Sequence, residues 1–199
     1  MAWSFAHREI KCYRKRIIVI ATEGEVTEPQ YFQRLNSMSQ TTVFNIVENL
    51  GNGSDPRAVL ARMKKYLKEN PLEAGDEAWI VIDQDKWTED SIKRIKDWAI
   101  QSQSKYHYAI SIRRFEDWLK VHVDGDKAAK KKYRNFLLGK EKHIPEDFLT
   151  KARVLIAMEK ARALVSTPMS VGNVFELMDS FFATNAQNVT PHKKKSKTF

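Results

Sequence analysis

Short apolar runs alternate with amphipathic segments along the first part of the chain. The run IIVIAT (residues 17–22) is β-branched and apolar without alternation, which is typical of a strand buried on both faces of a parallel sheet. EAWIVID (77–83) has the same continuous pattern. The predicted strands are residues 17–22, 42–49, 77–83 and 106–112. The predicted helices that follow them are residues 30–38, 57–70, 88–102 and 114–123.

This alternation of strand and helix predicts an α/β fold with a mostly parallel sheet and helices on both faces. From Asp126 onward the pattern is helical, which predicts a C-terminal helical extension over about residues 126–184, with helices in 145–165 and 167–182. We expect one domain over residues 17–190. The predicted flanking segments are a basic N-terminal segment, 1–16, and a disordered basic tail, 191–199.

Composition narrows the class of protein. The chain has 199 residues, of which 42% are hydrophobic, enough for one full core and too few for two ordinary domains. No apolar run reaches the length of about 20 residues that spans a bilayer, and the N-terminal segment lacks the apolar stretch of a secretory signal. The single cysteine, Cys12, excludes an internal disulfide and a cysteine-rich zinc site. These features predict a cytoplasmic protein without membrane contact.

The formal net charge is +9, from 34 lysines and arginines against 25 acidic residues. Such an excess favours a polyanionic partner such as nucleic acid, because each neutralised phosphate releases condensed counterions. Many basic proteins of this size bind no nucleic acid, and part of the excess lies in the tail, at Lys193, Lys194 and Lys195. The charge alone therefore leaves both alternatives open.

Acidic side chains collect where the predicted strands end. These acids are Glu23 after the first strand, Asp83 and Asp85 after the third, and Glu116 after the fourth. Because reactive groups in open α/β sheets lie at the carboxyl ends of the strands, all four are expected at one edge of the sheet. Gly24 permits a sharp turn that lets the Glu23 side chain point along this edge.

Carboxylate ligands without cysteine or histidine beside them select Mg²⁺ or Mn²⁺ over Zn²⁺. Asp83 and Asp85 lie two residues apart, so in an extended segment both can face one cation. Glu28, near the start of the next helix, is either a further metal ligand or a residue that only stabilises the helix start. Carboxylates that merely cap turns are the alternative. A second D-x-D triplet, residues 124–126, is interpreted as a turn and an N-cap.

Four segments carry a resemblance to known proteins: ATEGEVTEPQYF (21–32), GSDP (53–56), WIVIDQDK (79–86) and ISIRRFEDWLKVH (110–122), with TPMSVGNVFELM (167–178) as a weaker fifth. They resemble the Toprim catalytic domain, which topoisomerases, primases and OLD-family nucleases share. More closely, they resemble the RloB-like family, small Toprim proteins found beside restriction and abortive-infection genes in bacteria. The resemblance spans nearly the whole chain and implies a Toprim-like fold.

The resemblance also implies functional roles. It implies Glu23 as the glutamate of the Toprim site, Asp83 and Asp85 as its D-x-D pair, and Glu116 as the family's Phe-Glu element. Glu23 is then the candidate for proton transfer or metal bridging. Asp83 and Asp85 are candidate ligands of Mg²⁺ or Mn²⁺, and Glu116 is a further ligand or a group that orients one.

The chain departs from the family pattern in two places. Ile112, Arg113 and Arg114 stand where the family has an Asn-Pro-Cys-like run, and Lys86 follows the D-x-D pair, where an acid is frequent. Lys86, Arg113 and Arg114 are placed to contact phosphate and are the candidate nucleic-acid-binding residues. Solvated surface charge is the alternative for each of the three.

These inferences predict a metal-dependent nuclease that cleaves phosphodiester bonds in DNA or in RNA such as transfer RNA. The predicted role is that of an effector in an anti-phage defence system. The chain contains no P-loop, so ATP-driven sensing would require an ATPase partner protein. A topoisomerase is not expected, since it needs a separate domain that carries a catalytic tyrosine. The alternative is a non-catalytic Toprim module that binds nucleic acid or a partner protein.

Overall fold

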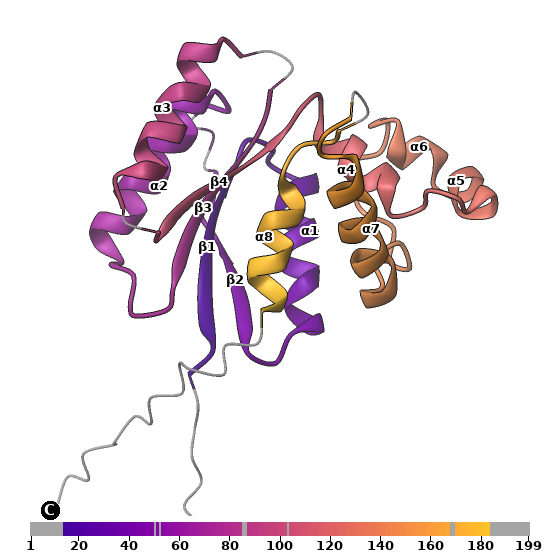
Figure 1. The fold of residues 1–199 in the computed structure, drawn as a ribbon, viewed down its shortest axis with the longest axis horizontal. Helices are drawn as coiled ribbons and strands as arrows, with labels where there is room; N and C mark the ends of the chain where they lie inside the picture. Colours follow the sequence, from indigo (N-terminus) through magenta and orange to yellow (C-terminus); the bar gives the residue numbers. More distant parts are fainter. Residues whose placement is uncertain are drawn as a thin grey trace, which may run out of the picture.

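Four parallel strands form the centre of the fold. A computed structural model describes residues 14–49, 51, 53–84, 87–102, 104–167 and 170–183. The strands are β1 (Arg16–Thr22), β2 (Thr42–Ile46), β3 (Glu77–Asp83) and β4 (Tyr106–Ser111). They lie in the order β2-β1-β3-β4, and every pairing is parallel (Figure 1). The predicted α/β fold with a parallel sheet is confirmed.

Strand β1 is buried because helices cover both faces of the sheet. Ile18 and Ile20 pack into one group of core residues, whereas Val19 and Ala21 pack into the other. None of these four side chains is more than 3% exposed. This explains why the sequence of β1 is apolar without alternation: neither side of the strand meets water.

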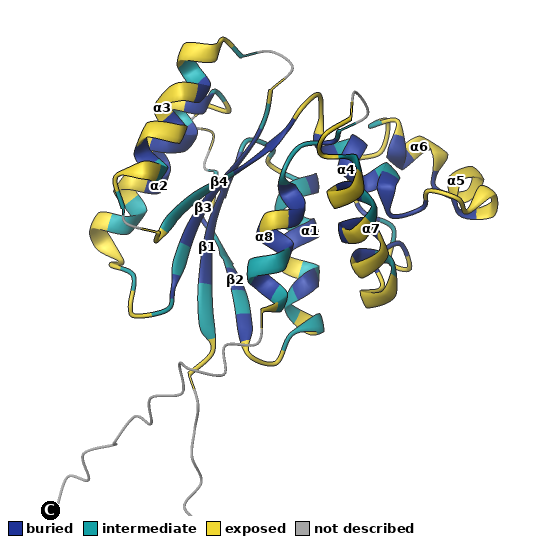
Figure 2. Ribbon diagram, in the orientation of Figure 1, coloured by how far each residue is buried: buried dark blue, intermediate teal, exposed yellow. Residues whose placement is uncertain are grey.

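The described residues form eight α-helices and one short 3₁₀ helix. They are α1 (Thr27–Leu35), η1 (Asn36–Met38), α2 (Pro56–Glu69), α3 (Glu89–Ile100), α4 (Phe115–Val121), α5 (Lys127–Lys132), α6 (Arg134–Leu137), α7 (Lys151–Leu164) and α8 (Val174–Phe182). Helices α2 and α3 cover one face of the sheet, and α1 and α8 cover the other (Figure 1). Helices α4 to α7 extend the second layer away from the sheet (Figure 2). Their buried residues belong to the same group of core residues as those of α1 and α8.

Polar caps start several helices where the sequence predicts a start. Asp55 accepts hydrogen bonds from the backbone N–H groups of Arg57 and Ala58, and Pro56 occupies the first helical position. Asp126 caps α5 in the same way, which confirms its interpretation as an N-cap.

The C-terminal helices begin later than the sequence pattern predicts. Helix α7 begins at Lys151 instead of near Pro145, because the hydroxyl of Thr150 accepts a hydrogen bond from the backbone N–H of Arg153 and so caps the helix there. Pro145 is held elsewhere, since its carbonyl oxygen accepts a hydrogen bond from Arg34 (2.8 Å). Similarly, α8 begins at Val174, directly after Asn173, which is hydrogen-bonded to β4.

Two asparagine side chains pair with the outer strands of the sheet. Asn36 accepts a hydrogen bond from the backbone N–H of Phe44 in β2 (2.7 Å) and donates to its carbonyl oxygen (3.1 Å). Asn173 accepts from the backbone N–H of Ile110 in β4 (2.7 Å), while its own backbone N–H donates to the Ile110 carbonyl oxygen (3.1 Å). Each asparagine therefore satisfies backbone groups that a neighbouring strand would otherwise pair.

Within the part of the chain that the structure describes, no helix is both long enough and apolar enough to cross a membrane. Most of the predicted N-terminal basic segment, up to residue 13, lies outside the described residues. The predicted tail, including Lys193, Lys194 and Lys195, lies outside them as well.

Substituting Gly172 by alanine should destabilise the fold strongly. A Cβ atom at Gly172 would lie 1.8 Å from the carbonyl oxygen of Ile110, and its φ of +97° disfavours any residue with a side chain. We expect Gly172→Ala to lower the free energy of unfolding by about 3 kcal/mol or more, measured by urea denaturation.

Gly125→Ala is the matched control. Gly125 has a φ of +84°, but the nearest atom to its Cβ position, Nζ of Lys160, is 3.7 Å away. This substitution should therefore cost only the strain of the backbone, about 1 kcal/mol. Equal losses for the two variants would contradict the claim that the approach of Gly172 to β4 is what excludes a side chain.

Candidate functional site

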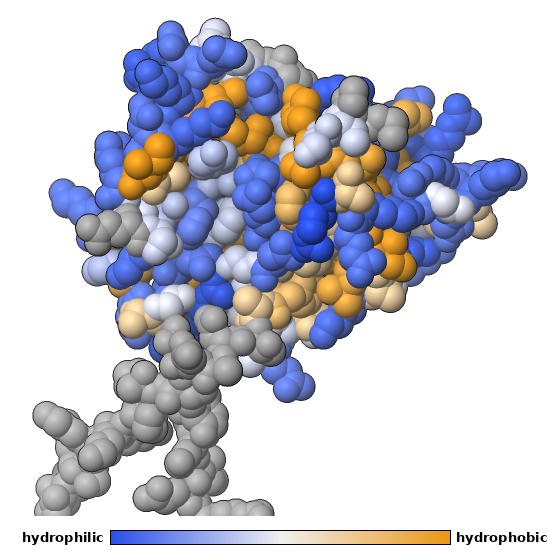
Figure 3. Space-filling view, in the orientation of Figure 1, coloured by the Kyte–Doolittle hydropathy of each residue, from blue (hydrophilic) through white to orange (hydrophobic). Residues whose placement is uncertain are grey.

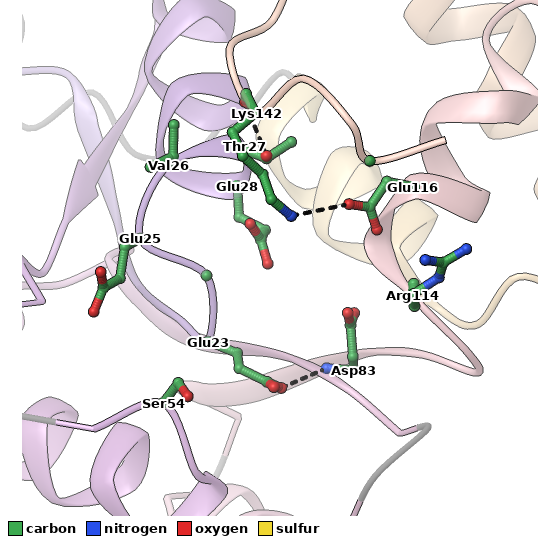
Figure 4. Close-up of a pocket in the computed structure, with 12 residues that line it drawn as sticks. Glu23, Glu25, Val26, Thr27, Glu28, Ser54, Asp83, Arg114, Glu116 and Lys142 are labelled. Atoms are coloured by element: carbon green, nitrogen blue, oxygen red, sulfur yellow. Dashed lines mark hydrogen bonds and ion pairs between the residues drawn. The ribbon is translucent and has the colours of Figure 1, made fainter. Parts of the chain in front are cut away.

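The carboxyl end of β1 is the point where the chain changes direction across the sheet. From β1 the chain passes to β2 through α1 on one face, and it returns to β3 through α2 on the other face. In open α/β sheets a crevice opens at such a switch point, and ligands bind there. A cavity of about 580 Å³ lies at this place, beyond the ends of β1 and β3 (Figure 4).

Glu23 joins the ends of the two central strands. Its backbone N–H donates to the carbonyl oxygen of Val81 in β3 (3.0 Å), so it still continues the ladder of β1. Its side-chain Oε2 accepts hydrogen bonds from the backbone N–H of Asp83 (3.0 Å) and from the indole N–H of Trp87 (3.1 Å). These bonds hold the Glu23 carboxylate in a defined position at the cavity.

Glu28 lies in the first turn of α1, and its carboxylate packs directly against Gly24. A Cβ atom at residue 24 would lie 2.0 Å from Oε2 of Glu28, so only glycine leaves room for this carboxylate. Burial raises the pKa of Glu28 to about 7, assisted by the negative charges of Glu116 and Glu23. The glycine that the sequence assigns to a turn therefore also makes space for a second acid.

Asp83 is the last residue of β3, and it lies among the same acids. Burial raises its pKa to about 8, assisted by the charges of Glu28 and Glu23. A hydrogen bond from the backbone of Phe115, at the start of α4, opposes this shift. Without a cation, both Asp83 and Glu28 therefore retain protons at pH values where carboxyl groups in water have lost them.

Glu116 in α4 completes the group of acids around the cavity. Its Oε1 lies 3.8 Å from Nζ of Lys142, which comes from the loop after α6. In Figure 4 the carboxylates of Glu28, Asp83 and Glu116 point toward the space between them, whereas the Glu25 carboxylate points away. Asp83 and Glu28 thus face other acids across the cavity.

The structure brings together most of the acids that the sequence predicts. The predicted site residues that line the cavity are Glu23, Glu28, Asp83, Glu116 and Arg114. Asp85 and Lys86 lie outside the described residues. Arg113 does not line the cavity and instead forms an ion pair with Asp117 (3.0 Å). The guanidinium group of Arg114 points away from the four carboxylates (Figure 4).

The sequence was also compared with models of known protein families. The sequence matches the model described as RloB-like protein over residues 18–187, which is most of the chain. The chain belongs to the RloB-like family. The resemblance that the sequence motifs indicate is thereby confirmed. The comparisons find no match among curated proteins or solved structures.

The acids of this RloB-like protein suit a hard divalent cation by their chemistry. The acids at the cavity offer carboxylate oxygens, the ligand type that Mg²⁺ and Mn²⁺ prefer. In the absence of a cation, burial raises the pKa of Asp83 to about 8 and that of Glu28 to about 7. As the side chains stand, no three His, Cys, Asp or Glu residues in the described ranges are close enough to hold one ion. A complete ligand shell would need rotation of these side chains, or Asp85.

Sequence reasoning missed several residues that build the site of the RloB-like protein. Trp87 fixes Glu23 through its indole N–H, and the only signal for it is a tryptophan soon after the D-x-D pair. Arg62 is buried in α2 and donates to the carbonyl oxygens of Thr22 (2.5 Å) and Gly53 (3.4 Å), which ties the end of β1 to the loop before α2. No local pattern identifies Lys142, because only the tertiary fold brings it to the cavity.

The metal-free RloB-like protein should lose stability as pH rises, through Asp83. A carboxyl group whose pKa is higher in the folded than in the unfolded chain stabilises the fold at low pH, and this contribution is lost as pH approaches the folded value. Between about pH 5 and about pH 8, the free energy of unfolding of wild type should therefore fall by about 1 to 2 kcal/mol relative to that of Asp83→Asn. This figure is smaller than the full pKa shift would give, because Asp83 is partly exposed to solvent.

Urea denaturation of both proteins in a chelating buffer across this pH range measures the effect. Glu25→Gln is the control, since the exposed Glu25 carboxylate points away from the other acids, and its pH dependence should parallel that of wild type. A constant difference between wild type and Asp83→Asn at every pH would contradict a proton held on Asp83.

Proposed function

We propose that this protein is a divalent-metal-dependent nuclease that cleaves phosphodiester bonds of DNA or RNA. The observation that carries the proposal is the gathering of Glu23, Glu28, Asp83 and Glu116 around one cavity at the switch point of the sheet. Buried carboxyl groups close to one another destabilise a fold, so their grouping favours a cationic ligand. The positive net charge of +9 favours a substrate that is a polyanion.

The residues divide the work according to their positions. Asp83 and Asp85 would hold a Mg²⁺ or Mn²⁺ ion, with Glu28 and Glu116 as further ligands or as groups that orient them. When bound, such an ion supplies positive charge to the phosphate and to the oxygen that leaves. Glu23, fixed by the Asp83 backbone and by Trp87, is placed to take a proton from the attacking water or to share in holding the metal.

We further propose that the nuclease serves anti-phage defence together with an ATPase partner protein. The support is the resemblance of the sequence to RloB-like proteins, small Toprim proteins found beside restriction and abortive-infection genes in bacteria. The sequence contains no P-loop, so ATP-dependent sensing falls to the partner. An adjacent ATPase gene, and fragments of nucleic acid sequenced from cells after induction of both proteins, would support this role.

Mn²⁺ binding should depend on the D-x-D pair. Combined Asp83→Asn and Asp85→Asn substitutions replace two charged ligands by neutral amides, and we expect Mn²⁺ affinity to fall at least about tenfold in calorimetric titration. Glu25→Gln removes the same kind of charge from a side chain that points away from the other acids, so its affinity should equal that of wild type. Equal Mn²⁺ binding by wild type and the double variant would refute the assignment of ligands.

Cleavage should depend on Glu23. Glu23→Gln keeps the volume and an oxygen for the Asp83 N–H, but deletes the charge that moves a proton or holds metal. We expect the rate of Mg²⁺-dependent cleavage of labelled DNA and RNA to fall by about two to four orders of magnitude. Glu25→Gln should cleave at the wild-type rate, and chelator should stop all cleavage.

The same pair of variants separates the nuclease from a non-catalytic binding module. If Glu23→Gln gives the same fragments at the same rate as wild type, this chain is not the nuclease. If the purified wild type binds nucleic acid but gives no metal-dependent fragments alone or with its ATPase partner, the chain is a binding module. In cells, Glu23→Gln should abolish growth inhibition when the trigger or partner is present.

A further inference from the structure

A dense group of cations lies in one segment. Residues 127–142, which comprise α5, α6 and the loop after them, contain seven lysines and arginines and one acidic residue. We call this range the basic segment. All seven cationic side chains are exposed, and seven positive charges against one negative charge give the segment a net charge of +6.

More than half of these cations form no ion pair within the residues that the structure describes. Lys130 pairs with Asp124 (2.7 Å), Lys132 pairs with Asp147, and Lys142 approaches Glu116. Within the described ranges, the cations of the basic segment that form no ion pair are Lys127, Lys131, Arg134 and Lys140. Their charges repel one another across a small area, which favours an anion that bridges them.

The C-terminal end of the basic segment is fixed next to the acidic cavity. Gly139 and Lys142 line the cavity directly. The hydroxyl of Thr27 donates to the carbonyl oxygen of Lys142 (3.0 Å), and Gln30 accepts from the backbone N–H of Ile144 (3.1 Å). Because Thr27 and Gln30 belong to α1, the loop is attached to the same helix that carries Glu28.

The inner side of the basic segment is occupied by core packing, which leaves the cations on the outer side. The rings of Tyr133 and Phe136 pack against Phe148, with centroids 5.2 and 5.0 Å apart. Residues over α5 and α6 are mostly hydrophilic at the surface (Figure 3). In the described part of the chain, the only large hydrophobic side chain of this segment that is exposed is Leu138. A surface with so little apolar area suits a hydrated phosphate backbone better than a membrane.

We propose that the basic segment binds the phosphate backbone of a nucleic-acid strand and leads it to the acidic cavity. The inference rests on the proposed nuclease function. Phosphates are repelled by the carboxylates of the cavity, so a strand needs an adjacent cationic surface to approach them. Two of the predicted nucleic-acid-binding residues belong to the described part of the chain. Arg113 is neutralised by its ion pair with Asp117, and the guanidinium group of Arg114 points away from the acids (Figure 4).

Charge removal at two matched places tests the proposal. One variant replaces Lys131, Arg134 and Lys140 of the basic segment by glutamine. The control replaces Lys64, Lys65 and Lys68 by glutamine. This removes the same charge from exposed lysines of α2, which lies on the other face of the sheet. Glutamine keeps a strong helix propensity, and thermal denaturation verifies that both variants are folded.

Binding is measured without metal, so the result does not depend on cleavage. The probes are fluorescent single strands and duplexes of DNA and RNA, titrated by anisotropy at several salt concentrations. In about 0.1 M salt, the basic-segment variant should bind at least about tenfold more weakly than wild type. Its slope of log affinity against log salt should be shallower by about 2 to 3. The α2 variant should bind within about twofold of wild type.

Each outcome decides the proposal. Equal losses in the two triple variants would overturn it, because net charge alone would then explain binding. Unchanged binding by the basic-segment variant, or no nucleic-acid binding by wild type, would also overturn it. Vesicles that contain phosphatidylserine serve as a second probe. If the basic-segment variant loses binding to these vesicles but binds nucleic acid as wild type does, the proposal is overturned and the segment is assigned to a membrane surface. If wild type binds through the basic segment but never cleaves with Mg²⁺ or Mn²⁺, the proposed function fails, and of this inference only the binding of the phosphate backbone stands.

Discussion

The burial of β1 on both faces is the constraint from which the rest of the structure follows. A strand without a polar side needs helices on both faces of the sheet. Because parallel crossovers are right-handed, the connection from β1 to β2 and the connection back to β3, which run in opposite directions, lie on opposite faces and supply these helices. Helix α1 takes one face and α2 the other, which makes the end of β1 a switch point with an open crevice. The first residue that leaves this strand is Glu23, so the strand that organises the core also places the first acid of the site.

The site brings together acids whose negative charges repel one another in the metal-free protein. Glu28 and Asp83 are partly buried beside other carboxylates, while the cations nearby lie mainly in the basic segment and not among the acids. Pairing each acid with a lysine would be better for the stability of the fold, but it would leave no charge for a ligand. The separation of acids in the cavity from cations beside it suits a substrate that is itself negative and reacts through a cation.

The sequence was sufficient for the fold and for the acids, because both depend on local patterns. The apolar runs of β1 and β3 identify the strands, and their order in the chain places Glu23 and Asp83 at one edge. The predicted start of α7, near Pro145, was wrong. The Thr150 hydroxyl caps the helix, so that it begins at Lys151, whereas the apolar periodicity of the sequence continues on both sides of Thr150. Lys142 and Arg62 could not be predicted at all, since each reaches the site through contacts between segments far apart in the chain.

Asn36 and Asn173 have a consequence for how this protein can meet other proteins. An outer strand normally presents a row of free N–H and C=O groups, which invites a strand from another molecule to add to the sheet. Here the amide of Asn36 occupies this position at Phe44, and Asn173 occupies it at Ile110, on the opposite margin. A strand that docks at either edge would therefore have to displace the asparagine of that edge. This makes association through helices the easier route and disfavours growth of the sheet at both margins.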